Sequence, residues 1–267
     1  MRACNRVSRF VVAFALGGFV MTGPASATSA ATDTSDIWWT PGESGWGMQL
    51  VHTGTFIFAT VFIYGADGKP TWITGELQAD PNNTYTGPAY VNSGPFYGGP
   101  WTSGAVTQRQ AGTMTFALQY VESGQLTYSV DGVVVNKNVE RQPLTLDSYA
   151  GSYVGTVTST ASGCTNPAGN VTVTNAGSLK IAQDGTATTV VYPIAGNGSC
   201  TINGTYSQLG RNGRVDGPYT CTTGEAGTAI MFQMNNNNPS MFMARLYLQS
   251  PGSGCTTSGQ VVALIPY

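Results

Sequence analysis

The segment between Cys200 and Cys221 constrains the fold of this chain more tightly than any other feature. Its midpoint falls between Gly210 and Arg211, inside a Leu-Gly-Arg-Asn-Gly stretch that is typical of a turn. Folding the chain at this point places Cys200 opposite Cys221 in an antiparallel strand pair. The same register gathers apolar side chains on one face and mostly Thr, Asn and Ser on the other. The other apolar pairs are Ile202 with Tyr219 and Tyr206 with Val215.

Directly opposed side chains of an antiparallel pair lie within disulfide reach, so we predict a Cys200–Cys221 bridge. Four cysteines in the second half of the chain allow three pairings. With the first bridge assigned, Cys164 pairs with Cys255 by elimination and joins the start of this region to its end. The sequence therefore predicts a disulfide-containing antiparallel β-barrel-like domain over residues 149–267.

A second hairpin signal lies in the first half of the chain, over residues 55–77. Asp67-Gly68 separates two apolar runs, which is a strong indication of a hairpin turn. We expect Phe62 to pair with Ile73. Phe58 would then lie opposite Leu77. Because the strand over 55–64 is apolar on both faces, we expect both of its faces to be covered.

Further strands are predicted over 45–52, 84–92, 112–120, 124–130 and 132–139. They form a Trp-rich β-meander domain of about seven strands over residues 36–141, as a barrel or a sandwich. The predicted fold class is therefore all-β, with two antiparallel β-domains, the second stapled by disulfides.

The N-terminus has the pattern of a cleavable export signal. Arg2, Arg6 and Arg9 precede an apolar run over 10–21, and Ala25-Ser26-Ala27 supplies small residues for cleavage. The apolar run is shorter than the roughly 20 residues of a transmembrane anchor. We expect residues 1–27 to be a signal peptide and the mature protein to be exported, to the periplasm or beyond the cell.

Charge excludes one class of partner. The full chain has 11 basic and 13 acidic residues, and the predicted cleavage removes three of the basic ones. An acidic mature chain lacks the basic footprint of a nucleic-acid-binding protein.

The sequence assembles no catalytic motif, and we predict no catalytic residue, cofactor or metal site. His52 is the only histidine and precedes a turn, so an ordinary structural histidine is favoured over a catalytic one. Glu43 and Glu76 are the best candidates for a glycosidase pair, although solvated surface carboxylates are the favoured interpretation. For Met231, Met234, Met241 and Met243, core packing is favoured over a Cu(I) site, with Met234 expected opposite Met241.

Aromatic residues carry the most functional information. All five tryptophans lie in the first region: Trp38, Trp39, Trp46, Trp72 and Trp101. Trp46 alternates with Met48 and Leu50 and is expected to be buried. Trp38, Trp39 and Trp101 lie outside clear strands and are expected to be more exposed. Candidate ligand-binding residues are Trp38, Trp39, Trp72, Trp101 and Glu43, since exposed rings can stack on a sugar or another apolar ligand.

The stretch Trp38-Trp39-Thr-Pro-Gly-Glu43-Ser44-Gly45-Trp46-Gly47, followed by the hairpin that ends at Trp72, resembles an uncharacterised family of exported bacterial β-proteins. That family opens with a W-W-x-P-x-E-S-G-W-G motif. The resemblance covers the first region, including the closing strand over 132–142, and the second region is similar to a cysteine-containing β-domain that sometimes accompanies it. It implies export and β-structure, and it assigns no activity or site residue.

We therefore expect a non-enzymatic binding or cell-envelope-associated module that stacks an extracellular glycan or another ligand on its tryptophans. One alternative is a structural or adhesive surface protein that self-associates through strand pairing between copies. A less favoured one is a glycoside hydrolase that uses Glu43 and Glu76.

Overall fold

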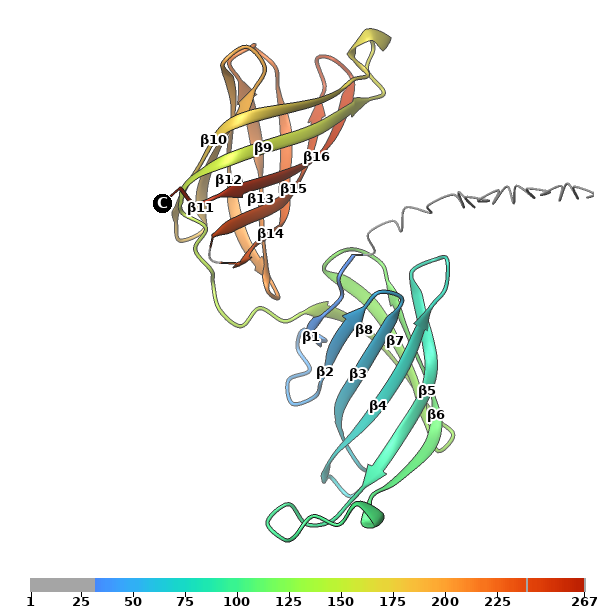
Figure 1. Cartoon of the computed structure of the whole chain (residues 1–267). Helices are drawn as coiled ribbons and strands as arrows, with labels where there is room; N and C mark the ends of the chain where they lie inside the picture. Colours follow the sequence, from blue (N-terminus) through green and yellow to red (C-terminus); the bar gives the residue numbers. More distant parts are fainter. Residues whose placement is uncertain (1–31, 239, 267) are drawn as a thin grey trace, which may run out of the picture. The chain divides into compact units, whose positions relative to one another are not determined.

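The computed structural model describes residues 32–238 and 240–266, and they form two closed antiparallel β-barrels (Figure 1). The predicted all-β fold with two β-domains is thereby confirmed, and both domains are barrels rather than sandwiches. The predicted signal peptide, residues 1–27, lies outside the described residues. No helix among the described residues has the length and apolar character needed to cross a membrane.

The first barrel is a meander in which each strand pairs with the next along the chain. Its strands are β1 (Asp36–Trp39), β2 (Gly47–Thr53), β3 (Phe56–Tyr64), β4 (Pro70–Ala79), β5 (Thr84–Ser93), β6 (Thr107–Leu118), β7 (Ser123–Val130) and β8 (Val133–Arg141). A 3-10 turn, η1 (Ser103–Ala105), lies in the long β5–β6 loop. Pairing of β1 with β8, through Trp38 with Arg141 and Trp39 with Glu140, closes the barrel.

The second barrel repeats this up-and-down topology. Its strands are β9 (Gly151–Ser162), β10 (Thr172–Asp184), β11 (Ala187–Ile194), β12 (Gly198–Leu209), β13 (Asn212–Cys221), β14 (Ala226–Asn238), β15 (Met241–Ser250) and β16 (Cys255–Leu264). A second 3-10 turn, η2 (Pro167–Gly169), lies between β9 and β10. Strand β9 pairs with β10 on one side and with β16 on the other, so this barrel is closed as well.

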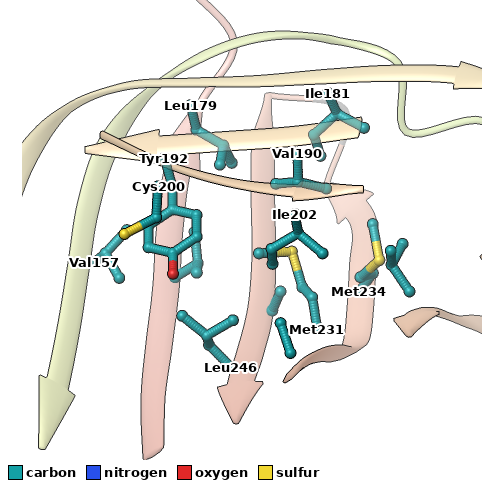
Figure 2. Packing of buried hydrophobic residues seen from close by; sticks show 14 of the residues in the cluster. Val157, Leu179, Ile181, Val190, Tyr192, Cys200, Ile202, Met231, Met234 and Leu246 are labelled. Atoms are coloured by element: carbon teal, nitrogen blue, oxygen red, sulfur yellow. The ribbon is translucent and has the colours of Figure 1, made fainter. Parts of the chain in front are cut away.

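Each barrel holds its own hydrophobic core, because alternate side chains of every strand point inward. In the second barrel the core includes Val190 and Ile202 on neighbouring strands, with Met231 and Leu246 across the interior (Figure 2). In the first barrel large rings occupy the interior, among them Trp38 and Phe116, whose ring centroids are 5.1 Å apart.

The predicted register around the β12–β13 turn is confirmed. Cys200 pairs with Cys221, and the neighbouring pairs follow as the alternation required: Ile202 with Tyr219, Thr205 with Asp216, and Tyr206 with Val215. The Cys200–Cys221 and Cys164–Cys255 disulfides are both formed. The first bridges adjacent strands of one hairpin, whereas the second connects the loop after β9 with the first residue of β16.

The predicted register of the β3–β4 hairpin was wrong by one residue. Phe62 pairs with Trp72 and Phe58 with Glu76, so Ile57, rather than Phe58, lies opposite Leu77. A one-residue slip exchanges the two faces of a strand. Ile57, Ala59 and Val61 therefore fill the interior, and the outer face of β3 is not covered.

The methionine register was also different from the prediction. Asn238, not Met234, pairs with Met241, and the register shifts between Phe232 and Asn235. Gln233 takes a left-handed backbone there, with φ of 50°. This irregularity turns both Met231 and Met234 into the core, where both are fully buried.

Trp38 is the clearest correction to the predicted exposures, because it lies on β1 and is 0% exposed. A strand of four residues is too short to show a period of two in the sequence, so β1 was not predicted. The indole of Trp38 donates from Nε1 to the Thr34 carbonyl oxygen at 2.9 Å. The Arg141 guanidinium lies over its ring, 4.8 Å from the centroid.

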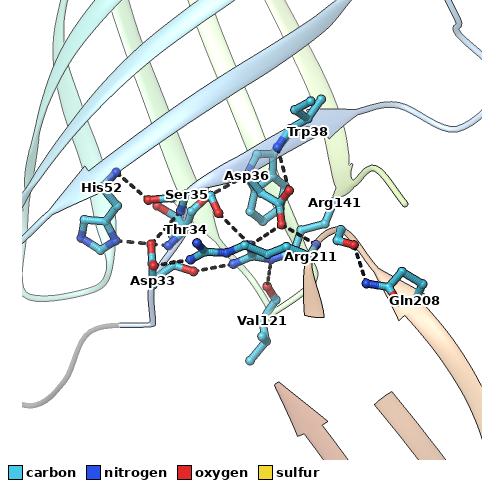
Figure 3. Close-up of polar contacts among 12 residues, drawn as sticks. Asp33, Thr34, Ser35, Asp36, Trp38, His52, Val121, Arg141, Gln208 and Arg211 are labelled. Atoms are coloured by element: carbon cyan, nitrogen blue, oxygen red, sulfur yellow. Dashed lines mark hydrogen bonds and ion pairs between the residues drawn. The ribbon is translucent and has the colours of Figure 1, made fainter. Parts of the chain in front are cut away.

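Arg141 ties together the seam at which the first barrel closes (Figure 3). Its side chain is buried and forms an ion pair with Asp36, with 2.9 Å between Nη1 and Oδ2. Its other nitrogens donate to the carbonyl oxygens of Val121 at 2.8 Å and Asp33 at 2.5 Å. A buried cation needs such partners. One side chain thereby links β1, β8 and the β6–β7 turn.

We predict that Arg141→Met lowers the free energy of unfolding by about 3 kcal/mol or more, because removal of one partner leaves a poorly solvated carboxylate and orphaned carbonyls. Urea unfolding of the whole chain measures this change. Arg109→Ala is the control: its ion pair with Asp131 is exposed and screened by water, so its loss should change the free energy of unfolding far less. Equal losses of stability in the two variants would contradict the role of Arg141 in holding the β1–β8 seam together.

The two disulfides should differ in their contribution to stability. The Cys164–Cys255 bridge spans 91 residues and the Cys200–Cys221 bridge spans 21. On the chain-entropy model the Cys164→Ser/Cys255→Ser variant should lose about 4–5 kcal/mol, and the Cys200→Ser/Cys221→Ser variant about 3 kcal/mol. Urea unfolding of both double variants provides the comparison, and the reverse order would contradict the model.

Candidate functional site

The outer surface of the first barrel over β1 to β4 presents a group of aromatic rings, most of them exposed. Every second residue of β3 points outward, and four of these five positions are aromatic. Trp72 on β4 pairs with Phe62 and lies beside it on the same surface; each is 50% exposed. We use the term aromatic face for the outward rings of this surface: Trp39, Phe56, Phe58, Phe62, Tyr64 and Trp72.

The strongest part of this face is a row that crosses four strands. Trp38 pairs with Met48, so one residue further in the same register Trp39 lies opposite Gly47. Gly47 pairs with Phe62, and Phe62 pairs with Trp72. Because Gly47 has no side chain, the row has a gap between the half-buried Trp39 ring and the Phe62 ring.

A polar row lies next to the aromatic row, two residues along the strands. Gln49 pairs with Thr60, Thr60 with Thr74, and Thr74 with Tyr90. Asn92 donates from Nδ2 to Thr74 Oγ1 at 3.3 Å. Beyond this row, Phe58 presents another exposed ring between Val51 on β2 and Glu76 on β4. The face therefore alternates rings with hydrogen-bonding groups at a spacing of about 7 Å.

The β5–β6 loop adds further rings at one end of the same barrel (Figure 1). The pairing of Ile73 with Val91 brings the end of β5 to the start of β4, so this loop leaves the barrel at the end where β3 meets β4. Trp101 in the loop is 72% exposed. Phe96 and Tyr97, also exposed, have ring centroids 4.7 Å apart. The predicted exposure of Trp101 is confirmed.

Glu43 lies in the β1–β2 loop and is held by two partners. Lys137 forms an ion pair with its carboxylate at 2.5 Å, and Trp46 donates from Nε1 to the same oxygen at 2.9 Å. These hydrogen bonds, that of Lys137 first, lower the pKa of the Glu43 carboxyl below its ordinary value. Lys137 also lies 5.3 Å from the centroid of the Trp46 ring, which is partly buried against the core.

The same loop contacts the aromatic face through Gly45. A Cβ on Gly45 would lie 3.4 Å from the Tyr64 hydroxyl, so the loop backbone packs against that ring. Its φ of 109° also favours glycine. The Glu43 loop therefore borders the Tyr64 end of the face.

Glu43 and Glu76 do not form a catalytic pair. Glu76 lies opposite Phe58, whereas the Glu43 loop borders Tyr64, six residues away on β3. Six residues of extended strand span about 20 Å, and glycosidase carboxyls are about 5–10 Å apart. Glu43 is also ionised by its partners, which does not suit a general acid.

His52 is engaged in structural hydrogen bonds, as Figure 3 shows in part. Its Nδ1 accepts from the Thr34 amide at 3.2 Å, which leaves Nε2 to donate to the Gly54 carbonyl oxygen at 2.9 Å. The ring also packs edge-on against Tyr85. These bonds position the segment that precedes β1.

Of the predicted ligand-binding residues, Trp39 and Trp72 lie on the aromatic face, Glu43 borders it, and Trp101 lies on the β5–β6 loop. Trp38 lies in the core and has no surface for a ligand. Sequence reasoning did not find Phe58, Phe62 and Tyr64 as candidate ligand-binding residues. It expected both faces of β3 to be covered, which left no exposed ring on this strand. The pattern Trp72-Ile-Thr-Gly-Glu-Leu77 alternates more cleanly and indicates which face of the hairpin is inside.

Clusters of three or more His, Cys, Asp or Glu side chains that could hold a metal ion are not found among the described residues. Comparison of the chain with protein-family models, with curated proteins and with solved structures gave no match. The resemblance of the Trp38–Gly47 motif to exported bacterial β-proteins stays a prediction.

We predict that Lys137→Met raises the pKa of the Glu43 carboxyl toward 4.5, its ordinary value, because it removes the strongest of the groups that favour the charged form. NMR titration of the side-chain carboxyl carbons measures the shift. Lys69→Met is the control, since Lys69 pairs with Asp67 in an exposed turn. An unchanged pKa in Lys137→Met would contradict the ion pair.

Proposed function

We propose that the protein is a non-enzymatic, exported binding module that stacks the sugar rings of an extracellular glycan on its aromatic face. The observation that carries this proposal is the row in which Phe62 lies directly beside Trp72, both half-exposed, with a row of hydrogen-bonding side chains next to it.

The chemistry of a glycan matches this alternation. The C–H faces of a sugar ring are apolar and pack on flat aromatic rings, whereas its hydroxyls point sideways and need donors and acceptors. Gln49, Thr60 and Thr74 offer such groups beside the rings. A purely apolar partner would leave this row unpaired on binding, which is costly.

Rigidity also favours this surface as a binding site. The rings of Phe62 and Trp72 stand on central strands of a closed barrel, each paired on both sides. The backbone loses little freedom when a ligand binds to such a preorganised surface. A regular strand surface also suits a ligand with a repeating unit.

Export is part of the same proposal. Two disulfides are typical of proteins that fold in an oxidising compartment, and the Arg-rich, then apolar N-terminal sequence has the pattern of a secretion signal. An extracellular or periplasmic glycan is the ligand that such a protein would meet.

Self-association by strand pairing receives less support. Pairing between copies needs a strand with a free edge, and in the described residues both sheets close on themselves. Stacking of two aromatic faces is the remaining route to a dimer, and it would bury the rings on which the glycan proposal depends.

We expect Trp72→Ala and Phe62→Ala each to weaken binding to the recognised polysaccharide about five- to tenfold, because one stacked ring contributes about 1 kcal/mol. The wild-type chain is first assayed against a panel of insoluble polysaccharides and purified peptidoglycan, and the variants against whichever binds. Tyr120→Ala is the control: Tyr120 is exposed, but it lies in the β6–β7 turn, outside the aromatic face.

Absence of binding to every member of the panel would overturn the proposal. Equal affinity of the Trp72→Ala and Tyr120→Ala variants would overturn the assignment of the face. Sedimentation at increasing protein concentration tests self-association. A dimer that the Trp72→Ala substitution dissociates would support self-association through the aromatic face instead of glycan binding.

A further inference from the structure

The second barrel contains a pocket at the end that carries its disulfides. The pocket has a volume of about 820 Å³, within the range of small-molecule sites. The loops that follow β9, β11, β13 and β15 surround it. Cys200, Cys221 and Cys255 contribute to its lining, so both bridges hold its wall.

The wall of this pocket is mainly apolar. Ile194, Leu246 and Leu248 project from β11 and β15, and Val171 and Val173 from the start of β10 and the residue before it. Small residues such as Gly169, Ala226 and Gly252 leave the space that longer side chains would fill. A ligand that fits here presents an apolar surface to most of the wall.

One polar group at the pocket has no hydrogen-bond partner among the described residues. Tyr192 is 2% exposed, and its hydroxyl is one of the few buried polar atoms without a hydrogen bond among the described residues. Figure 2 shows its ring projecting inward near Cys200 and Leu246, which also line the pocket. Burial raises the pKa of Tyr192, with Tyr219 and Glu225 adding to the effect, so this hydroxyl stays protonated at neutral pH.

A second polar group is Glu225, near the outer part of the pocket. Its Oε1 accepts hydrogen bonds from the Tyr219 and Ser250 hydroxyls. Among the described residues that line the pocket, it is the only one with a formal charge. The pocket thus offers a buried donor, an exposed acceptor and a negative potential that repels anions.

We propose that this pocket binds a small, mainly apolar molecule, neutral or cationic, whose carbonyl or hydroxyl oxygen accepts a hydrogen bond from Tyr192. The mainly apolar wall disfavours a free sugar, and the charge of Glu225 disfavours a fatty acid or another anion. A donor on the ligand is recognised by the carboxylate of Glu225. This pocket belongs to the other barrel, so the inference does not depend on glycan binding.

The test uses two fluorescent probes with the whole chain. Prodan, a neutral naphthalene ketone, should bind with a blue shift in its emission, whereas anilinonaphthalene sulfonate, an anion of similar size, should bind at least tenfold more weakly. Tyr192→Phe, which removes only the hydroxyl, should weaken prodan binding about tenfold. Tyr247→Phe is the control, because it removes a hydroxyl from the outward side of β15, next to Leu246.

Two further variants locate the probe and test the charge. Leu246→Trp fills the pocket and should abolish prodan binding, provided its circular dichroism matches that of the wild type; Leu248→Trp substitutes for it if it does not fold. Glu225→Gln should bring the affinity for the sulfonate to within a few fold of that for prodan. Unchanged prodan affinity in Tyr192→Phe, or equal binding of both probes by the wild type, would overturn the proposal.

Discussion

Closure of each eight-stranded sheet on itself is the constraint from which the other features of this protein follow. A closed barrel gives every strand residue one of two places, inside or outside, and an eight-stranded barrel is just wide enough for side chains to fill it. The first barrel achieves closure across its shortest strand, β1, with Arg141 as the polar link. Once the sheet is closed, no strand edge is left for pairing, and binding has to use either the outer surface or a mouth.

The two closed barrels offer different surfaces for binding, because their interiors are filled differently. Large rings occupy the interior of both barrels, those of Trp38 and Phe116 in the first and those of Tyr149 and Phe242 in the second, and the difference lies at one mouth. In the first barrel the outer surface of β3 and β4 carries the exposed rings of Phe56, Phe58, Phe62, Tyr64 and Trp72. In the second barrel small residues line one mouth, so space remains inside that end. The same topology therefore yields an outer aromatic surface in one half and a pocket at one mouth in the other.

Sequence reasoning succeeded where the two faces of a strand differ in polarity. Around Cys200 and Cys221 one register alone separates apolar from polar side chains, and the structure has that register. The β3 strand gives no such signal, because Phe58 and Phe62 outside are as apolar as Ile57 and Val61 inside. A symmetrical strand allows a slip by one residue, and only its partner β4, where Thr74 and Glu76 alternate with Ile73 and Leu77, decides between the two.

The sites were harder to predict than the strands because they are assembled across the sheet. Trp38 was expected at the surface because its burial depends on Arg141, more than 100 residues away in the chain. The pocket of the second barrel left no local motif at all: Tyr192, Glu225 and Ser250 come from β11, the β13–β14 turn and β15, and each alone resembles an ordinary β-barrel residue. What distinguishes Tyr192 is a missing partner, a property that exists only after the barrel has closed. Buried hydroxyls in folded proteins nearly always find an acceptor, and the proposed ligand would supply the one that the Tyr192 hydroxyl lacks among the described residues.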